Sequence, residues 1–339
     1  MNAQENLGFR QNIIDSLDQY ETGLAIAKAA KVEGSFQALV VSGMGGSALP
    51  ADIVQMYCKD VALRHQSVPV NIVQNRTYAL PFETKTQEHL HVVCSYSGNT
   101  EESISCLDDA IRNNLPCIGI SAGGRLQELC QENNIPHILL PIPTPTFQPR
   151  MGTGYFFGAL VEILINHSLL PDVREEVLTG ASEVKENIAA REAEGKELAS
   201  QLVGKTPVIY SSFQYKSVAM IWKIKINENA KTPAFWNFLP EMNHNEMVGY
   251  TLPQGAFHVI LLRDPQDDAR NLKRYDVLLP LLAEKGVTGN VIDILGNKVY
   301  TGILNTLLLG DFTAYYLALA YGQDPEPVEM VEAFKKALQ

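Results

Sequence analysis

Residues 90–102 read LHVVCSYSGNTEE, a short apolar run followed at once by hydroxyl, amide and glycine residues and then by two acidic residues. The apolar run, 90–94, has the length and composition of a buried parallel strand, and a helical pattern follows from Thr100 to Ile111. The same alternation surrounds this stretch: further apolar runs lie at 38–41, 70–73, 117–120 and 137–140, and a further helical pattern lies at 48–57. Alternating strands and helices predict a doubly wound α/β sheet.

A proline-rich stretch, PIPTPTFQPR at residues 141–150, divides the chain. Its prolines are too dense for a helix or a central strand, so we expect an amino-terminal domain at 1–150 and a carboxyl-terminal domain at 151–339. The second domain repeats the alternation, with helical patterns at 155–169, 173–202, 218–227, 304–321 and 328–338 and apolar runs at 208–210, 258–262 and 291–294. We therefore predict an α/β protein with two doubly wound parallel sheets.

The chain of 339 residues is 46% hydrophobic and 19% charged, and its formal net charge is -11. This composition excludes a disordered or collagen-like chain, and the acidic balance disfavours nucleic acid and anionic lipid as partners. Five cysteines at no CxxC spacing indicate reduced core residues of a cytosolic protein: Cys58, Cys94, Cys106, Cys117 and Cys130. The amino terminus has neither a basic region nor a continuous apolar stretch, so we expect a cytoplasmic protein without an export signal or membrane span.

A glycine-rich turn, Gly43-Met44-Gly45-Gly46-Ser47, directly follows the first expected strand. Its glycines let the backbone approach a ligand closely, and Ser47 can offer a hydroxyl to an anion at the start of a helix. No lysine follows, as a Walker sequence would require, and the glycine spacing does not match a dinucleotide fingerprint. Taken alone, the turn is equally consistent with a tight connection and nothing more.

The cluster from Ser95 to Thr100 is more specific, because it places four small hydroxyl or amide side chains within six residues. Together with the free N–H groups of a helix start, they form a neutral cradle for a phosphomonoester. Such a cradle lets an acidic protein bind an anion without lysine or arginine. The alternative is that Thr100 only caps the helix, with Glu101 and Glu102 complementing the helix dipole.

With both motifs in this order, the sequence resembles the sugar isomerase (SIS) domain, whose phosphate site pairs a GxGxS turn with a later SxSGxT loop. A third segment, NENAKTPA at 227–234 followed by PEMNHNE at 240–246, resembles the bifunctional phosphoglucose/phosphomannose isomerase family. The resemblance implies two flavodoxin-like SIS domains and an enzyme that interconverts glucose 6-phosphate, and mannose 6-phosphate, with fructose 6-phosphate. It also implies that the phosphate is bound by Gly45, Gly46, Ser47, Ser95, Ser97 and Thr100.

Aldose–ketose isomerisation needs a base that moves a proton between C1 and C2 of the open-chain sugar. Glu228, at the end of a helical pattern, suits this role, and the resemblance likewise places the base there. It also implies that His244 opens the sugar ring and comes from the partner subunit of a homodimer, a role that suits a group titrating near neutral pH. The alternatives are a solvated glutamate at a helix end and a loop histidine bonded to Asn243, Asn245 or Glu246.

Two cations complete the site that the resemblance implies. Arg150 matches the arginine that stabilises the enediolate, and its alternative is an interdomain ion pair. The carboxyl-terminal lysine of the family best matches Lys335, with Lys336 as the other candidate. Val328 stands where archaeal members have a threonine that assists epimer tolerance, so the sequence supports phosphomannose activity less strongly than phosphoglucose activity.

The remaining histidines form no metal-ligand spacing, so we expect an isomerase without a metal or another cofactor, in contrast to a zinc-type phosphomannose isomerase. Two rivals remain. A non-catalytic SIS module that senses sugar phosphates would need neither Glu228 nor His244, although no basic helix-turn-helix pattern is visible in the first thirty residues. The other rival is an SIS isomerase that acts on an amino-sugar, pentose or heptose phosphate.

Overall fold

The computed structural model describes residues 6–338, which form two compact units. One unit comprises residues 15–183, and the other combines residues 6–14 with residues 184–338. Residues 1–5 and 339, which belong to the expected domains, lie outside the described part of the chain. Residues 1–5 also begin the stretch in which we expected no export signal.

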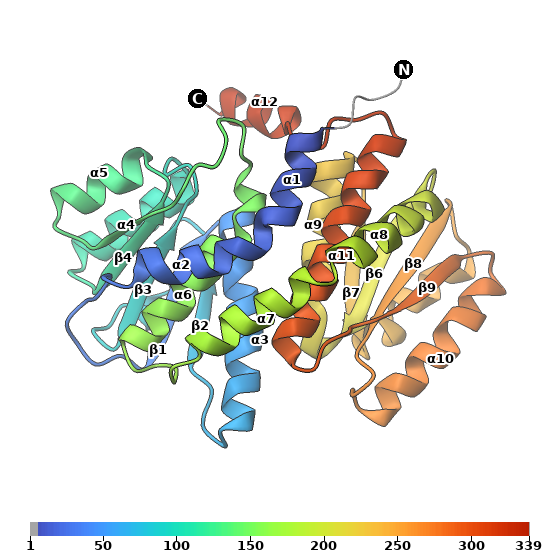
Figure 1. Ribbon diagram of the computed structural model, residues 1–339, viewed down its shortest axis with the longest axis horizontal. Coiled ribbons are helices and arrows are strands. Elements are labelled where there is room, and N and C mark those ends of the chain that lie inside the picture. The colour runs from blue at the N-terminus through green and yellow to red at the C-terminus, as the bar shows by residue number, and fades with distance from the viewer. Residues whose placement is uncertain (1–5, 339) are drawn as a thin grey trace. The chain divides into compact units, whose positions relative to one another are not determined.

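The amino-terminal unit is built on a five-stranded parallel sheet in the order β2-β1-β3-β4-β5 (Figure 1). Its strands are β1 (Ala38–Gly43), β2 (Asn71–Asn75), β3 (His89–Cys94), β4 (Cys117–Ser121) and β5 (His137–Leu139). The strand order reverses at β1 and β3, whose registers pair Gly43 with Cys94 at the carboxyl ends. Doubly wound sheets bind their ligands at such a reversal, so the fold directs attention to the loops that follow β1 and β3.

Helices cover both faces of this sheet. On one side, three helices pack together: α2 (Gln19–Ala27), α3 (Leu49–Arg64) and α6 (Thr153–Asn166). The other side is covered by α4 (Glu101–Arg112) and α5 (Gly124–Glu132). α7 (Arg174–Lys185) contains the boundary of the unit. Apolar residues of β3 and β4 meet α4 and α5 in a core that includes Val93, Leu107 and Leu126.

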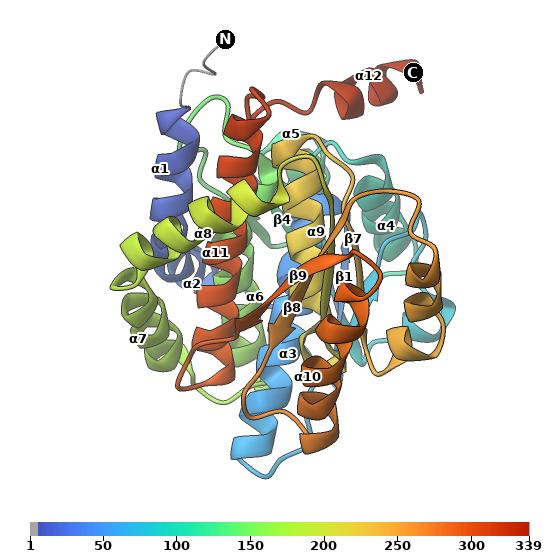
Figure 2. The ribbon, with the colours of Figure 1, turned by 90° about the vertical axis from the view of Figure 1, so that its right-hand side faces the viewer.

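The carboxyl-terminal unit has a four-stranded parallel sheet in the order β7-β6-β8-β9. Its strands are β6 (Thr206–Ser212), β7 (Phe235–Leu239), β8 (Phe257–Arg263) and β9 (Thr288–Asp293). α8 (Ile188–Leu202), α9 (Lys216–Ala230) and α11 (Val299–Ala320) pack together, while α10 (Ala269–Ala283) contributes Tyr275 and Leu278 to another core beside β6 and β8. Figure 2 shows α10 alongside β8 and β9. The expected pair of doubly wound parallel sheets is confirmed.

α11 is the one helix among residues 6–338 that is long and apolar enough to cross a membrane. Within its most apolar stretch, 83% is buried inside the protein. It packs against α8 and α9, and its Asp311 forms a buried ion pair of 2.7 Å with Lys225 of α9. These contacts make α11 the central helix of its own unit.

Several elements differ from expectation. The structure adds the strand β7, and it divides the expected helix 173–202 into α7 and α8 at residues 186–187. We expected a domain boundary at residue 150, but the amino-terminal unit continues to Glu183, because α6 packs on α2 and α3. The first helix, α1 (Leu7–Asp15), joins the other unit instead, since Phe9 stacks on Tyr315 and Arg10 pairs with Glu192 at 2.6 Å.

The five cysteines are all buried and unpaired with one another, as expected for reduced core residues. Burial raises the pKa of Cys117 to about 11 and the pKa of Cys58 to about 12. Thiols with raised pKa values are poor nucleophiles near neutral pH, so these two side chains act in packing.

Candidate active site

The turn after β1 brings the first predicted phosphate-binding residues to the carboxyl end of the sheet. Gly45, Gly46 and Ser47 form a short 3-10 turn, η2 (Gly45–Ser47), just before α3. Ser47 is 6% exposed, and its Oγ accepts a hydrogen bond of 2.9 Å from the backbone N–H of Tyr96. The turn after β1 is therefore bonded directly to the loop after β3.

Ser95 organises the loop after β3. Its side chain is buried, and its Oγ accepts hydrogen bonds from the backbone N–H groups of Gly98 at 3.1 Å and Thr100 at 3.4 Å. The hydroxyls of Ser95 and Thr100 are also bonded to each other at 2.9 Å. Ser97 is exposed, with its Oγ 3.3 Å from the N–H of Asn99. The loop thus has an internally bonded base and an exposed hydroxyl.

Helix capping does not account for the hydroxyl of Thr100. Thr100 occupies the N-cap position of α4, but its side chain makes no capping hydrogen bond and contacts Ser95 instead. The amino end of α4 therefore retains its positive dipole end beside these hydroxyls. That combination can bind an anion through local dipoles alone.

Gly98 permits the sharp path of this loop. Its φ is +71°, and a Cβ atom there would lie 1.8 Å from the carbonyl oxygen of Gly123. The loop is consequently pressed against the start of α5, and Leu126 donates its N–H to the carbonyl of Gly98 at 2.9 Å. Only glycine fits both the conformation and the contact.

Arg150 lies beside the turn after β1, in the amino-terminal unit. Its backbone nitrogen is so close to Gly46 that a Cβ on that glycine would lie 2.6 Å from it. The Arg150 side chain is 1% exposed, and its Nη1 donates to Oε1 of Gln148 at 3.2 Å. Gln19 of α2 fixes the short 3-10 turn that contains Arg150 (Pro149–Met151) by donating a hydrogen bond of 2.8 Å to the carbonyl of Met151. A guanidinium is therefore built into the turn that adjoins the predicted phosphate loops.

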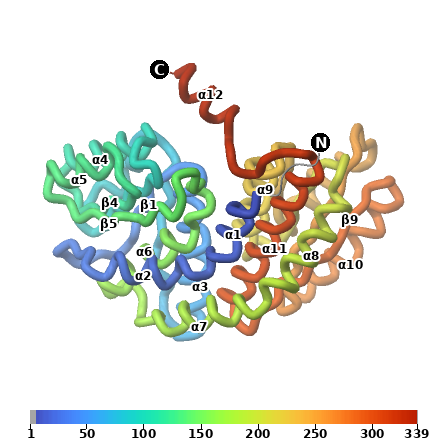
Figure 3. The backbone as a smooth tube through the Cα atoms, turned by 45° about the horizontal axis from the view of Figure 1, so that its top comes forward, coloured from blue at the N-terminus to red at the C-terminus, as the bar shows by residue number. Residues whose placement is uncertain are grey.

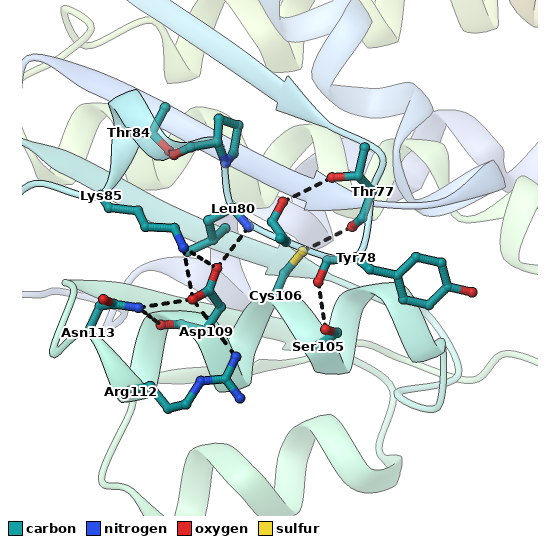
Figure 4. A network of polar contacts seen from close by, with 12 residues as sticks. Thr77, Tyr78, Leu80, Thr84, Lys85, Ser105, Cys106, Asp109, Arg112 and Asn113 are labelled. Carbon is teal, nitrogen blue, oxygen red and sulfur yellow. Dashed lines mark hydrogen bonds and ion pairs between the residues drawn. The ribbon is translucent and has the colours of Figure 1, made fainter.

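A polar network holds α4, and with it the second loop, against the segment that follows β2 (Figure 4). Asp109 of α4 accepts hydrogen bonds of 3.0 Å from both the N–H of Leu80 and the Nζ of Lys85. Ser105 donates to the carbonyl of Tyr78 at 2.6 Å. Burial by itself would raise the pKa of Asp109, but the bonds from Lys85 and Leu80 hold it below its usual value.

Glu228 lies in the last turn of α9, in the carboxyl-terminal unit. Its side chain is half-buried, and its backbone carbonyl accepts a hydrogen bond of 2.6 Å from Nζ of Lys231, the left-handed residue that ends the helix. A carboxylate near the negative end of a helix dipole is disfavoured by roughly 0.3–1 kcal/mol. Helix stability therefore gives no reason for a glutamate at this position.

His244 lies on an irregular segment between β7 and β8, formed by the 3-10 turns η6 (Glu241–His244) and η7 (Glu246–Thr251). The His244 side chain is exposed, whereas Met242 and Tyr250 on either side of it are buried in the core beside β6 and β8. The segment thus presents His244 on its outer side. Asn243 is bonded to Arg274 of α10 and Asn245 to Glu241, so the proposed neighbours of His244 have partners of their own.

Lys335 and Lys336 lie on α12 (Glu329–Ala337), which projects from the carboxyl-terminal unit (Figure 3). None of the described residues of α12 is buried. The Nζ of Lys335 pairs with Glu332 one turn earlier at 2.7 Å. Lys335 therefore lies on an exposed helix and is bonded within that helix.

The structure brings together the six predicted phosphate-binding residues and Arg150, all in the amino-terminal unit. Glu228, His244 and Lys335 lie in the other unit. Among residues 6–338, no three His, Cys, Asp or Glu side chains are grouped as a metal ion would require. Sequence reasoning did not find the bonding role of Tyr96, although this residue stands inside the loop motif, nor that of Glu246, although it stands two residues after His244.

Comparison with known proteins identifies the family. A bifunctional phosphoglucose/phosphomannose isomerase from Caldicellulosiruptor bescii is 34% identical over 94% of this chain and 94% of its own length. The chain belongs to that family. A bifunctional phosphoglucose/phosphomannose isomerase from Aquifex aeolicus is 31% identical over 90% of this chain and 91% of its own. The model of the bacterial phospho-glucose isomerase C-terminal SIS domain matches residues 191–338.

The fold has relatives of more distant sequence. The C-terminal domain of a glucosamine-fructose-6-phosphate aminotransferase from Francisella tularensis superposes with a TM-score of 0.70 over 94% of this chain and 98% of its own. Its sequence is only 13% identical, so this likeness shows the shared fold. As a member of its family, the protein is an isomerase of the intramolecular oxidoreductase class that acts on sugar phosphates.

Proposed function

We propose that the enzyme interconverts glucose 6-phosphate and fructose 6-phosphate, and mannose 6-phosphate and fructose 6-phosphate, through one cis-enediolate. The enediolate has lost the stereocentre at C2, so a single base serves both epimers if the pocket lets a proton return to either face. Membership in a family named for both activities supports this substrate pair.

The observation that carries the proposal is the joined pair of loops in the amino-terminal unit. Ser47 and Tyr96 bond the turn after β1 to the loop after β3, at the position where the strand order reverses. The phosphoryl group is bound by four hydroxyls and by the backbone of the first turn. The hydroxyls are those of Ser47, Ser95, Ser97 and Thr100, and the backbone groups are those of Gly45 and Gly46. Neutral donors at a helix start suit a dianion in a protein whose net charge is -11.

Glu228 transfers the proton between C1 and C2 of the substrate whose phosphate these loops bind. Its place on a rigid helix end, where it does not benefit the helix, supports a catalytic role. Arg150, a buried guanidinium next to Gly46, supplies the fixed positive charge that stabilises the enediolate. The amino-terminal domain thus provides phosphate binding and the carboxyl-terminal domain provides the base.

His244 opens the sugar ring, and it does so in the active site of the partner subunit of a homodimer. The exposure of His244 on the outer side of its segment supports a role toward a second molecule. Lys335, or Lys336 beside it, completes the site from α12. This exposed helix can pack on another surface when the site forms. Residues 329–337 would then become buried upon assembly.

The enzyme acts in the cytoplasm, on the hexose-phosphate step shared by glycolysis and gluconeogenesis. Five buried cysteines that are unpaired with one another support a reducing compartment. The proposed reaction requires no cofactor.

The test is an NMR assay in which glucose 6-phosphate, mannose 6-phosphate and glucosamine 6-phosphate are supplied separately. We expect fructose 6-phosphate to form from glucose 6-phosphate and from mannose 6-phosphate, and no turnover of glucosamine 6-phosphate. Turnover of the amino sugar alone would indicate another SIS isomerase. Binding of these compounds without turnover would indicate a sensor.

A further inference from the structure

Glu246 makes the central polar contacts of the segment that carries His244. One carboxylate oxygen, Oε1, accepts a hydrogen bond of 2.6 Å from the hydroxyl of Tyr210. The other, Oε2, accepts a hydrogen bond of 2.5 Å from the side-chain amide of Asn237. Both oxygens are therefore bonded to the sheet, two residues along the chain from His244.

The two donors are positioned by the sheet itself. Tyr210 lies on β6 and Asn237 on β7, and the parallel register pairs these residues directly. Paired residues of neighbouring strands point to the same face, so their side chains can converge on one carboxylate. Asn237 cannot simply turn its amide around, because its Oδ1 accepts the N–H of Phe238 at 2.8 Å.

Tyr250 extends the network behind Tyr210. The two hydroxyls are 2.7 Å apart, and both tyrosines are buried. Burial raises the pKa of Tyr250 to about 12 and raises the pKa of Tyr210 further, so both hydroxyls keep their protons and can donate. Since Tyr210 donates to Glu246, Tyr250 donates to Tyr210.

Elsewhere in the segment from 243 to 249, Asn243 is bonded to Arg274 of α10 and Met247 packs against the core beside β6 and β8. Its buried side chains, Met242 and Tyr250, flank this part, and Val248 between them is 66% exposed. The backbone N–H of Glu246 is itself bonded to Oδ1 of Asn245 at 2.5 Å, which fixes the start of η7. Glu246 therefore adds the bonds to β6 and β7 in the middle of a segment that apolar packing and the Asn243–Arg274 bond also hold.

We propose that Glu246 is a positioning residue that holds the His244 segment on the sheet and so enables ring opening of the bound sugar. This inference rests on the proposed role of His244. It assigns Glu246 no contact with the substrate and no proton transfer. It predicts that loss of Glu246 impairs substrates that enter as rings and spares a substrate that is already open.

The experiment compares fructose 6-phosphate with 5-deoxyfructose 6-phosphate, which lacks the hydroxyl needed to close the furanose ring. With Glu246→Ala we expect turnover of fructose 6-phosphate to fall by about 10²-fold, the cost of a catalytic group displaced by roughly 1 Å. Turnover of 5-deoxyfructose 6-phosphate, followed by NMR, should stay within about threefold of the unmodified enzyme, because general acid–base ring opening is not needed there.

A matched pair of tyrosine variants tests the same point with milder changes. Tyr210→Phe removes a direct donor to Glu246, whereas Tyr250→Phe removes a hydroxyl from the same network without touching Glu246. We expect Tyr210→Phe to reproduce the selective loss in weaker form and Tyr250→Phe to leave both substrates nearly unaffected. Glu246→Gln should restore most activity, since its amide can still bond both neighbours if the tyrosine hydroxyls reverse their direction.

The outcomes separate this inference from the proposed function. If the unmodified enzyme fails to isomerise fructose 6-phosphate, the proposed function fails. If it is active but Glu246→Ala loses both substrates equally while remaining folded, or loses neither, the positioning role of Glu246 is contradicted. Equal effects of Tyr210→Phe and Tyr250→Phe would contradict it as well, even if Glu246→Ala did not fold.

Discussion

The Oγ of Ser47 accepts a hydrogen bond of 2.9 Å from the backbone N–H of Tyr96, and this bond joins the two proposed phosphate-binding loops. The sequence alone shows only the order of these loops along the chain. Ser47 follows the first strand and Tyr96 the third, and these strands are neighbours in the sheet. The same loops adjoin the backbone of Arg150 through Gly46. The two proposed phosphate-binding loops are therefore joined to each other by the protein's own hydrogen bond.

Removing the hydroxyls of Ser97 and Thr100 from the second loop should weaken substrate binding. Ser97→Ala and Thr100→Ala are each expected to raise KM for fructose 6-phosphate about tenfold or more, the effect of losing one hydrogen bond to a charged group. Steady-state kinetics provide the measurement. Ser200→Ala is the control, because the Ser200 hydroxyl bonds the carbonyl of Glu197 within α8, and the KM of that variant should not change. An unchanged KM for Ser97→Ala and Thr100→Ala would place the phosphate elsewhere.

The conformation of the second loop depends on Gly98. Gly98→Ala adds a Cβ that meets the Gly123 carbonyl at a φ of +71°, so we expect a loss of at least about 2 kcal/mol in stability together with weaker phosphate binding. Gly45→Ala is the matched comparison, since its φ is +50° and no atom lies within 4 Å of the new Cβ. It should cost about 1 kcal/mol. Urea denaturation distinguishes the two, and equal losses would show that the Gly123 contact is unimportant.

Glu228→Gln separates chemistry from folding. We expect turnover to fall by about three orders of magnitude, as for the loss of a general base, with KM little changed. The free energy of unfolding should stay equal or rise by about 0.3 kcal/mol, because the substitution removes a negative charge from the carboxyl end of a helix, which itself carries a partial negative charge. Glu284→Gln, at the end of α10, is the control and should keep full turnover. Near-normal turnover of Glu228→Gln would remove Glu228 from the role of base.

The network around Asp109 should make stability depend on pH. The folded-state pKa of Asp109 lies below its unfolded value, so its contribution is fully present above about pH 4 and is lost as the pH falls through the folded-state value. Asp109→Asn should therefore destabilise the protein by about 1–3 kcal/mol at pH 7, and by progressively less below pH 4. Urea denaturation across pH tests this, with Asp108→Asn as the control. A difference independent of pH would contradict the assignment.

Much of the fold could be predicted, because central strands such as β3 are mostly apolar and helices such as α4 have a strong amphipathic pattern. β7 could not, because it lies at the edge of its sheet and its sequence, FWNFL, is largely half-exposed. The break between α7 and α8 falls at Asn187, a residue common at helix starts, within a pattern that otherwise reads as continuous.

The candidate site could be predicted where motifs are local. The loop from Ser95 to Thr100 forms its own hydrogen bonds, so its residue types indicated its structure. The contact of Arg150 with Gly46 and the bond of Glu246 to Tyr210 join residues far apart in the chain. Such pairs leave no spacing in a single sequence from which they could be derived.

A crystal structure of Glu228→Gln with fructose 6-phosphate bound tests the phosphate site and the base together. We expect the phosphoryl group within hydrogen-bond distance of the hydroxyls of Ser47, Ser97 and Thr100, and the side chain of residue 228 beside C1 and C2 of the open chain. A phosphoryl group bound in another cleft, or residue 228 remote from C1 and C2, would contradict this expectation.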